Sequence, residues 1–368
     1  MYNQIRGELF FAYYGGVAVL CLIACCYLLL RRSNAIAPDI TSSKRLRRWT
    51  AALFASMALC HVWYLPTYFL TPGDDAMLSP LVCGLLDSLT VLPLSIIVML
   101  VMLQDRRRPL WPAFAMTLPL TAGITWCIAI RSYALVPILN IYGLLMYVAT
   151  IIYMLHAQRQ YGRWLRDNYA DLQHKELWQS PVVLLVFLLT FVVYDFETDG
   201  LIYEYVMETI DIVLVCYLLW RVETLSDLDF DGGLNPLSTK KNSPPLTKKT
   251  TEKIGPLLKL HCEEQQLYLQ YDMTVTELAR RIGTNRVYLS QHFSMQGTTY
   301  NAYINGLRIQ HFIRLYREAS ATHHLVTVQQ LAHQSGFRSY GTFNSAFKQS
   351  MGKTATEWML DQGNTGLQ

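Results

Sequence analysis

The sequence predicts an all-α protein in two parts, a seven-transmembrane helical bundle followed by a smaller cytoplasmic helical module. Hydrophobic residues make up 52% of the chain and charged residues only 16%, against about 25% charged in ordinary soluble chains. Seven long apolar stretches occupy the first 220 residues, and the last third is basic and shows helical periodicity. An ordinary water-soluble globular protein is therefore not expected.

The charge of the chain is divided unevenly. From Lys240 onward there are 15 Lys and Arg against 8 Asp and Glu, whereas the preceding residues have 16 basic against 19 acidic side chains. A length of 368 residues allows two or three domains. We expect a membrane domain at 1–221, a linker at 222–252, and at 253–368 a basic domain suited to an anionic partner such as nucleic acid.

Seven stretches are long and apolar enough to be considered as spans. They are Leu9–Leu30, Trp49–Leu70, Leu81–Leu103, Leu110–Ile130, Tyr133–Leu155, Pro181–Tyr194 and Leu201–Trp220. Lys and Arg gather in the connections after the odd-numbered spans, which predicts the N-terminus outside and the C-terminal module in the cytoplasm. The sixth span is short and the seventh carries acids, so an alternative in which both are re-entrant, or one is soluble, stays open.

Polar side chains within the predicted spans are the candidates for a signal or ligand site. Three acids of the seventh span recur at i, i+4 and i+7, which places them on one helical face. The full set, predicted at similar depth in the outer half, is His61, Asp87, Arg131, Glu204, Glu208 and Asp211. The residues are consistent with an outward-facing, partly aqueous pocket, or with interhelical hydrogen bonds and interfacial positions.

Two connecting segments differ in composition. Residues 158–179 mix aromatic with charged side chains, which is typical of an amphipathic interfacial helix, a dimer contact, or the cytosolic ends of two helices and a turn. Residues 222–252 contain Gly232-Gly233 and Pro244-Pro245 without apolar periodicity. They predict a flexible tether with a span of roughly 30 Å.

The C-terminal third repeats one pattern twice. An apolar helical stripe is followed by a glycine suited to a left-handed turn, and then by a second helix with an inward apolar face. In the first copy these positions are Leu278, Ala279, Ile282, Gly283, Leu289 and Phe293, with Asn285 as a helix cap. In the second copy they are Val328, Leu331, Ala332, Gly336, Phe343 and Phe347. Each copy predicts a helix-turn-helix, whose second helix can enter a major groove.

A continuous helix is predicted over Tyr303–Glu318, between the two copies. Its arginines, Arg308, Arg314 and Arg317, are predicted to be available to the surface. A rigid helix of this kind would fix the separation of the two units. At about 34 Å the second helices would address successive major grooves.

This pattern resembles the DNA-binding module of AraC/XylS-type transcription regulators over about Leu257–Leu360. The run from Gly336-Phe337 through Tyr340 and Phe343 to Phe347-Lys348 carries the strongest likeness, supported by Leu278-Ala279, Tyr288-Leu289-Ser290, Gly297, Arg308-Ile309, Gly352 and Trp358. The chain departs from the family at Ala355, where proline is typical. By architecture, the remainder is similar to regulators with a multi-span N-terminal half, which implies the bacterial cytoplasmic membrane as its location.

The resemblance implies which residues face DNA. The expected set is Arg286, Val287, Ser290, Gln291, Arg338, Tyr340, Gly341, Thr342, Asn344, Ser345 and Lys348. Amide side chains suit adenine, Arg286 suits guanine or phosphate, and Val287 or Thr342 suits a thymine methyl group. Arg338 and Lys348 are better suited to phosphate. The alternative for each is a solvated surface residue.

These observations lead to a membrane-anchored one-component regulator that senses a signal at the membrane or outer face and binds promoter DNA. We expect double-stranded promoter DNA, the lipid bilayer and a second copy of the chain as partners, with RNA polymerase as a further candidate. The alternatives are a receptor or transporter-like protein whose C-terminal module is an accessory interaction domain, or an enzyme in the membrane half. No G-x-S-x-G, H-E-x-x-H, Walker or zinc-ligand spacing is present, so we expect no enzyme, metal or cofactor.

Overall fold

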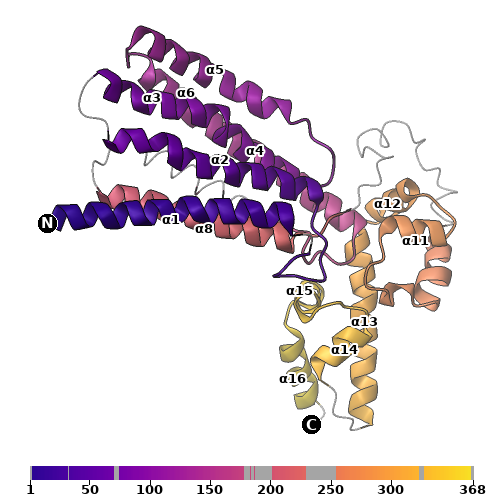
Figure 1. The fold of residues 1–368 in the computed structure, drawn as a ribbon. Coiled ribbons are helices and arrows are strands. Elements are labelled where there is room, and N and C mark those ends of the chain that lie inside the picture. Colours follow the sequence, from indigo (N-terminus) through magenta and orange to yellow (C-terminus); the bar gives the residue numbers. More distant parts are fainter. Residues whose placement is uncertain are drawn as a thin grey trace. The chain divides into compact units, whose positions relative to one another are not determined.

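The computed structural model describes residues 2–31, 33–69, 74–177, 201–228, 254–322 and 327–365, together with Val183 and Val186. Throughout these ranges the regular elements are helices, and one isolated antiparallel bridge joins Tyr169 to Thr274. The chain packs as two compact units (Figure 1). The bundle unit contains Met1–Tyr161 and Leu177–Phe230, and the C-terminal unit contains Gly162–Glu176 and Asp231–Gln368.

The bundle unit is built from long apolar helices. They are α1 (Tyr2–Leu30), α2 (Lys44–Phe69), α3 (Asp74–Leu89), α4 (Val91–Met102), α5 (Trp111–Ile130), α6 (Val136–Asn168) and α8 (Leu201–Thr224). Helix α1 packs against α2 and α8, α2 against α4, and α3 against α5. A break at Thr90 separates α3 from α4. The bundle therefore buries its core by helix-on-helix packing.

Four lengths of described helix are long and apolar enough to cross a membrane: Glu8–Leu30, Leu78–Met102, Trp111–Ile130 and Val136–Asn168. They coincide with the first, third, fourth and fifth predicted spans. The second and seventh predicted spans are helical, as α2 and α8, but polar side chains such as His61 and Glu208 lower their hydropathy. The sixth lies, except for Val183 and Val186, outside the described residues. The structure thus supplies four candidates where the sequence predicts seven.

Residues 222–228 pack against the bundle unit. The Glu223 side chain is 1% exposed, and its Oε2 accepts hydrogen bonds from the backbone N of Ala35 and of Ile36 at 2.9 and 2.8 Å. The Asp227 N donates to the Thr41 carbonyl at 2.8 Å. The sequence predicts that these residues begin the flexible tether. The hydrogen bonds of Glu223 and Asp227 instead hold them against the bundle unit. The rest of the predicted linker, 229–252, lies outside the described residues.

The C-terminal unit contains the two expected helix pairs. A helical stretch begins at Ile254 and ends as the π-helical η1 (Lys259–Glu264), followed by η2 (Leu267–Leu269). The first pair is α11 (Val275–Arg281) and α12 (Arg286–Met295); the long α13 (Tyr300–Ala321) follows. The second pair is α14 (Val328–Gln334) and α15 (Tyr340–Met351), and α16 (Ala355–Thr365) ends the unit. The predicted continuous helix between the pairs is confirmed.

Each helix pair has its own apolar core, built from the predicted stripes. Leu278, Leu289 and Phe293 are at most 2% exposed in the first core. Phe343 and Phe347 are fully buried in the second, where they pack against Phe312 of α13. Both turn glycines have a positive φ, 71° at Gly283 and 87° at Gly336. The left-handed turn expected in each pair is therefore confirmed.

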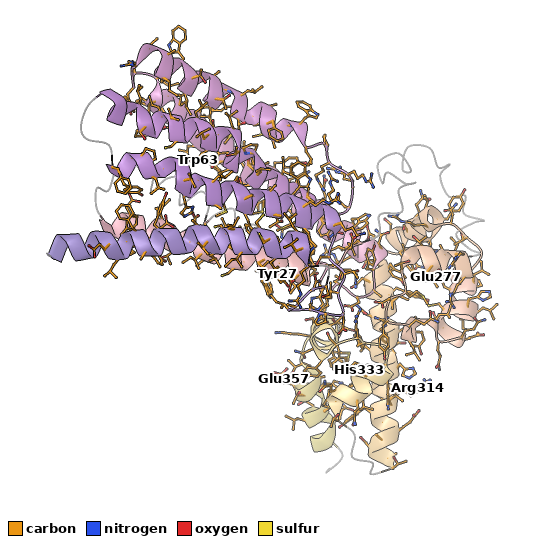
Figure 2. All side chains as sticks on the ribbon, viewed as in Figure 1. Tyr27, Trp63, Glu277, Arg314, His333 and Glu357 are labelled. Atoms are coloured by element: carbon orange, nitrogen blue, oxygen red, sulfur yellow. The ribbon has the colours of Figure 1, made fainter. Side chains whose placement is uncertain are left out.

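Side-chain caps set where the helices begin. Asn285 Oδ1 accepts from the Tyr288 backbone N at 2.9 Å, as predicted. At α16, Glu357 (labelled in Figure 2) accepts from the Thr354 N at 2.8 Å, and Thr354 Oγ1 accepts from the Glu357 N at 3.3 Å. This reciprocal capping box starts the last helix at Ala355 without the proline typical of the family.

Arg308 was expected at the surface and is instead 1% exposed. Its Nε donates to the Tyr268 carbonyl at 2.7 Å and its Nη2 to the Gln270 carbonyl at 2.8 Å. The guanidinium also lies 5.6 Å from the centroid of the Phe337 ring. Burial lowers the pKa of Arg308, while Tyr300 and Asp171 act in the opposite direction. The side chain thus connects elements of the first pair to the second.

Candidate functional site

Helices α12 and α15 occupy the recognition position of their pairs. In α12, Leu289 and Phe293 face the core, which leaves the expected reading residues on the other side. Arg286, Val287, Ser290 and Gln291 are all half-buried rather than freely exposed. The Gln291 Oε1 is buried and has no hydrogen-bond partner among the described residues. The face of α12 is therefore partly covered, which the sequence did not predict.

The corresponding face of α15 is more open. Tyr340, Gly341 and Ser345 are exposed, whereas Thr342 and Asn344 are half-buried. Ser339 caps this helix, and its hydroxyl accepts from the Thr342 backbone N at 3.2 Å. The cap fixes the first turn, where the expected base-reading residues begin.

The two side chains assigned to phosphate contact are exposed. Arg338 Nη1 lies 3.5 Å from Asp272 Oδ1, and both groups are at least half exposed. Surface pairs of this kind contribute about 0–1 kcal/mol, so the guanidinium can exchange its carboxylate for a phosphate. Lys348 lies exposed in the last turn of α15. Both positions suit backbone contacts that orient a protein on DNA.

The segment Gly162–Glu176 also belongs to this unit and reaches the expected DNA-facing residues. Thr342 Oγ1 donates to Asp171 Oδ1 at 3.2 Å. Asp167 and Tyr169 oppose the lowering of the Arg286 pKa by burial. Asn301 and Asn305 of α13 donate to the Ala170 carbonyl at 2.6 and 3.2 Å. The sequence singled out none of these contacts, because they join positions more than a hundred residues apart.

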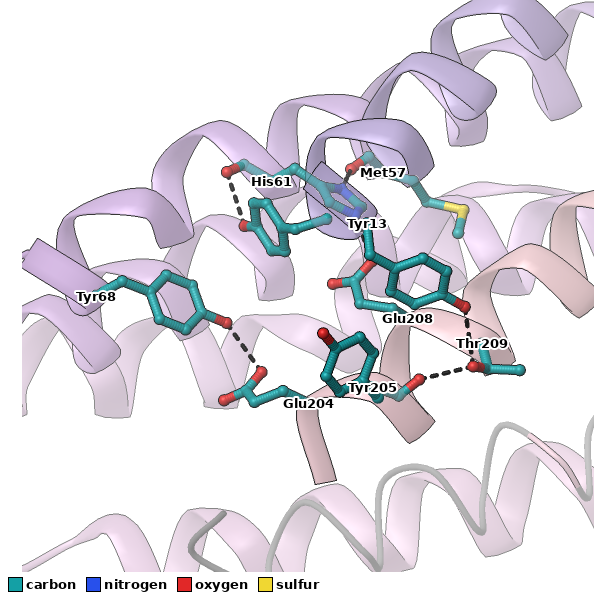
Figure 3. A network of polar contacts seen from close by, with 9 residues as sticks. Tyr13, Met57, His61, Tyr68, Glu204, Tyr205, Glu208 and Thr209 are labelled. Atoms are coloured by element: carbon teal, nitrogen blue, oxygen red, sulfur yellow. Dashed lines mark hydrogen bonds and ion pairs between the residues drawn. The ribbon is translucent and has the colours of Figure 1, made fainter. Parts of the chain in front are cut away.

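A network of polar side chains lies inside the bundle unit (Figure 3). His61 of α2 and Glu208 of α8 are 5% and 9% exposed at their side chains, and Nε2 lies 3.0 Å from Oε2. The Tyr14 hydroxyl donates to the His61 carbonyl at 2.7 Å, and the Tyr68 hydroxyl donates to Glu204 at 2.9 Å. The structure therefore brings together residues predicted from separate spans.

The protonation of His61 is constrained by its second ring nitrogen. Nδ1 lies 2.7 Å from the Met57 carbonyl, which only accepts hydrogen bonds, so Nδ1 carries a proton. Nε2 then either donates to a Glu208 carboxylate or accepts from a Glu208 carboxylic acid. In both states one proton lies between Nε2 and Oε2, so the two residues can exchange it without a change of partners.

The remaining candidate signal residues have different surroundings. Asp87 accepts from the Tyr64 hydroxyl at 2.8 Å and lies 3.5 Å from the Cys60 Sγ, next to His61 in the sequence. Asp211 lies one turn beyond Glu208 and is half-buried. Arg131 is exposed and ends α5 in a left-handed conformation. The structure places Asp87 beside the network and Arg131 at a helix end.

The candidate metal ligands and nucleophiles are the His, Cys, Asp and Glu side chains of the described residues. No group of three or more His, Cys, Asp or Glu side chains there could hold a metal ion. The thiol of Cys262 is buried in the first core, and burial raises its pKa to about 12. A protonated, buried thiol of this kind is a packing residue rather than a nucleophile.

Two capped helix pairs joined by a long continuous helix define a module of the double helix-turn-helix class. Residues 278–360 match the family described as helix-turn-helix domain. The expected resemblance is confirmed for this part of the chain, which is an AraC-type helix-turn-helix domain.

Two similar curated proteins are the TCP pilus virulence regulatory proteins of Vibrio cholerae serotype O1, from a Classical Ogawa and an El Tor Inaba strain. Each is 26% identical to this chain over 133 residues, which cover 36% of this chain and 44% of the relative. The match thus spans less than half the length of these relatives. No solved structure matches the chain.

Proposed function

We propose that the chain is a membrane-anchored one-component transcription regulator of the bacterial cytoplasmic membrane, which binds promoter DNA through α12 and α15. One observation supports it above others. An AraC-type domain is joined to helices whose apolar side chains point outward, with Val19, Ile138 and Ile152 at 54%, 62% and 63% exposure. Such surfaces are stable in lipid and costly in water. Four candidate helices are a minimum for this anchor, and we propose seven spans with the N-terminus outside.

The proposed signal site is the buried network around His61 and Glu208, with Asp87, Glu204 and Asp211 beside it. Ionisable groups inside a membrane bundle are costly to bury, so they are typical of functional sites. Arg131 is placed outside this site because it is exposed at a helix end. A second copy of the chain is the proposed partner, because two modules on neighbouring sites raise each other's effective concentration.

DNA binding is tested with the full chain in lipid nanodiscs and a fluorescent mixed-sequence duplex. The affinity should fall steeply with salt, by about a thousandfold between 50 and 200 mM if six or more phosphates are neutralised. Arg338→Ala should reduce the salt slope by about one. Lys353→Ala, which removes a basic residue paired with Asp361, is the matched control and should change the slope less. A chain that binds no duplex at low salt would instead support the accessory-module alternative.

The topology is tested with sidedness reporters fused after Leu228 and within residues 195–200. The first should report the cytoplasm and the second the outer side, since basic connections stay inside. Equal sidedness at the two positions would contradict the seven-span proposal.

The signal site is tested with Glu208→Gln, which keeps the shape of the side chain but removes its negative charge. We expect an altered transcriptional response without loss of membrane insertion or of DNA binding, since Glu208 belongs to the bundle unit. Tyr13→Phe, which removes an exposed hydrogen bond between α1 and Thr209 of α8, is the matched control. A Glu208→Gln response equal to wild type under every condition would favour a purely structural pair.

A further inference from the structure

The segment Gly162–Glu176 is seated in the C-terminal unit by specific contacts. Ala170 is 1% exposed and belongs to the first core. Its carbonyl accepts from Asn301 Nδ2 at 2.6 Å, and Tyr169 forms the antiparallel bridge with Thr274. Buried backbone groups of the segment are therefore paired as in the interior of a domain.

The same segment contacts the second recognition helix, α15. Asp171 is 4% exposed, and its Oδ1 accepts from Thr342 in the first turn of α15. Burial lowers the pKa of Arg286, the first residue of α12, and the charges of Tyr169 and Asp167 act in the opposite direction. The segment is also held by Asn301 and Asn305 of α13. The segment thus contacts the beginning of α15 and the α13 helix directly.

The side-chain groups in these contacts are of the kinds that bind a DNA backbone. Hydroxyl groups bind phosphate oxygens, and here the Thr342 hydroxyl instead donates to the Asp171 carboxylate. DNA that receives both helices in successive major grooves must pass its intervening backbone between them. We expect that backbone to approach the α13 surface where Asn301 and Asn305 hold the segment.

Helix α12 also holds an unsatisfied acceptor in this arrangement. The Gln291 Oε1 is buried without a hydrogen-bond partner among the described residues. A buried unpaired acceptor costs free energy, whereas an adenine amino group in a major groove would satisfy it. In this structure the recognition face of α12 therefore contains an unpaired acceptor that DNA would satisfy.

We propose that residues 167–173 are an internal competitor of DNA, which must leave the surface between α12 and α15 before both helices can enter the major grooves. This inference rests on the proposed function. Since α6 runs without a break from Val136 to Asn168, a displacement of this helix moves the residues that follow it. A signal that displaces α6 would therefore release the competitor, and this transmission does not depend on the predicted linker.

The first test is Asp171→Asn in the full chain in nanodiscs, with a fluorescent mixed-sequence duplex as probe. The variant keeps the size of the side chain but removes its charge, which weakens the contact to Thr342. We expect DNA binding to become about fivefold tighter. Glu318→Gln, which removes one negative charge from an exposed position on α13, is the matched control for the change of net charge and should have a smaller effect.

The second test locks the segment in place with Tyr169→Cys and Thr274→Cys. Directly paired residues in an antiparallel bridge lie at a distance that suits a disulfide. The oxidised protein, with its linkage verified by mass spectrometry, should lose at least about tenfold in affinity, and reduction should restore it. This readout remains available if Asp171→Asn fails to fold.

The outcomes separate the two proposals. One outcome would overturn the competitor proposal alone: the reduced protein binds the duplex, but neither the disulfide lock nor Asp171→Asn changes the affinity more than the Glu318→Gln control does. The proposal of DNA binding would then remain. If no form binds DNA at any salt concentration, the proposed function fails, and the competitor fails with it.

Discussion

The two helix pairs of the C-terminal unit make the same turn with glycine, but the glycines differ in what surrounds them. Gly283 has φ 71° and open space where a Cβ would project. Gly336 has φ 87°, and a Cβ there would lie 2.7 Å from the Leu269 Cα and 2.9 Å from its carbonyl oxygen. The first glycine is required only by its backbone conformation. The second also allows the η2 backbone to approach closely.

This difference shows how two copies of one sequence pattern can differ in their tolerance of substitutions at the turn glycine. In the first pair the turn faces outward, whereas in the second it forms part of the packing between η2 and the second core. A backbone atom cannot move aside as a flexible side-chain end can. Equivalent substitutions should therefore have unequal effects, and the comparison can be tested directly.

The largest expected effect is that of Gly336→Ala. The added methyl group meets the Leu269 backbone, and the residue must keep a positive φ, so we expect a loss of about 4 kcal/mol in the stability of the C-terminal unit. Gly283→Ala, the matched variant, meets only the backbone strain and should cost about 1 kcal/mol. Hydrogen exchange of the α12 and α15 amides in the full chain measures both. Equal losses at the two positions would contradict the packing difference.

A smaller effect distinguishes reading from positioning on α15. Asn344→Ala should leave the fold intact and relax specificity at one base pair by about 1–3 kcal/mol. Lys348→Ala should weaken binding to all sequences alike, because it removes only a phosphate contact. Binding to a randomised duplex library, sequenced after selection, separates these patterns. A uniform loss on every sequence from Asn344→Ala would refute its assignment as a reader.

The smallest effect is a pH dependence that we expect in the first pair. His292 is 3% exposed, its Nδ1 is buried without a partner among the described residues, and burial lowers its pKa. The position equivalent to His292 in α15 is Ala346. Because the folded state disfavours the charged form, the stability should be full above about pH 6.5 and fall as the pH drops below it.

Hydrogen exchange at a series of pH values measures this dependence. The α12 amides should lose protection below about pH 6.5, and His292→Gln should reduce the loss. The α15 amides serve as the internal control. An unchanged pH profile in the His292→Gln variant would assign the dependence to another group.

Local patterns explain why the C-terminal fold was largely predictable. The stripes at Leu278 and Leu331, the glycines at 283 and 336, and the cap at Asn285 each act within a few residues. Each therefore leaves a signal that can be read along the chain. The polar positions His61 and Glu208 could likewise be selected as costly residues, although their pairing at 3.0 Å could not.

Long-range contacts explain what was missed. Arg308 was expected at the surface because a charged residue on an amphipathic helix usually is, and its burial depends on the Tyr268 and Gln270 carbonyls and the Phe337 ring. The position of Ala170 in the first core depends on a hydrogen bond from Asn301, which lies far away in the sequence. The span count was difficult for another reason, since α2 and α8 combine apolar with ionisable residues.

The burial of Arg308 has a consequence for recombination between related modules. A chimaera joined within α13 would draw its two helix-turn-helix halves from different parents. Its guanidinium would then need the Tyr268 and Gln270 carbonyls from one parent and the Phe337 ring from the other. Halves exchanged without these partners would leave a charge buried and unpaired, which destabilises proteins by about 3–5 kcal/mol. Evolution can therefore exchange the reading residues on α12 and α15 freely, but the halves themselves only as a matched set.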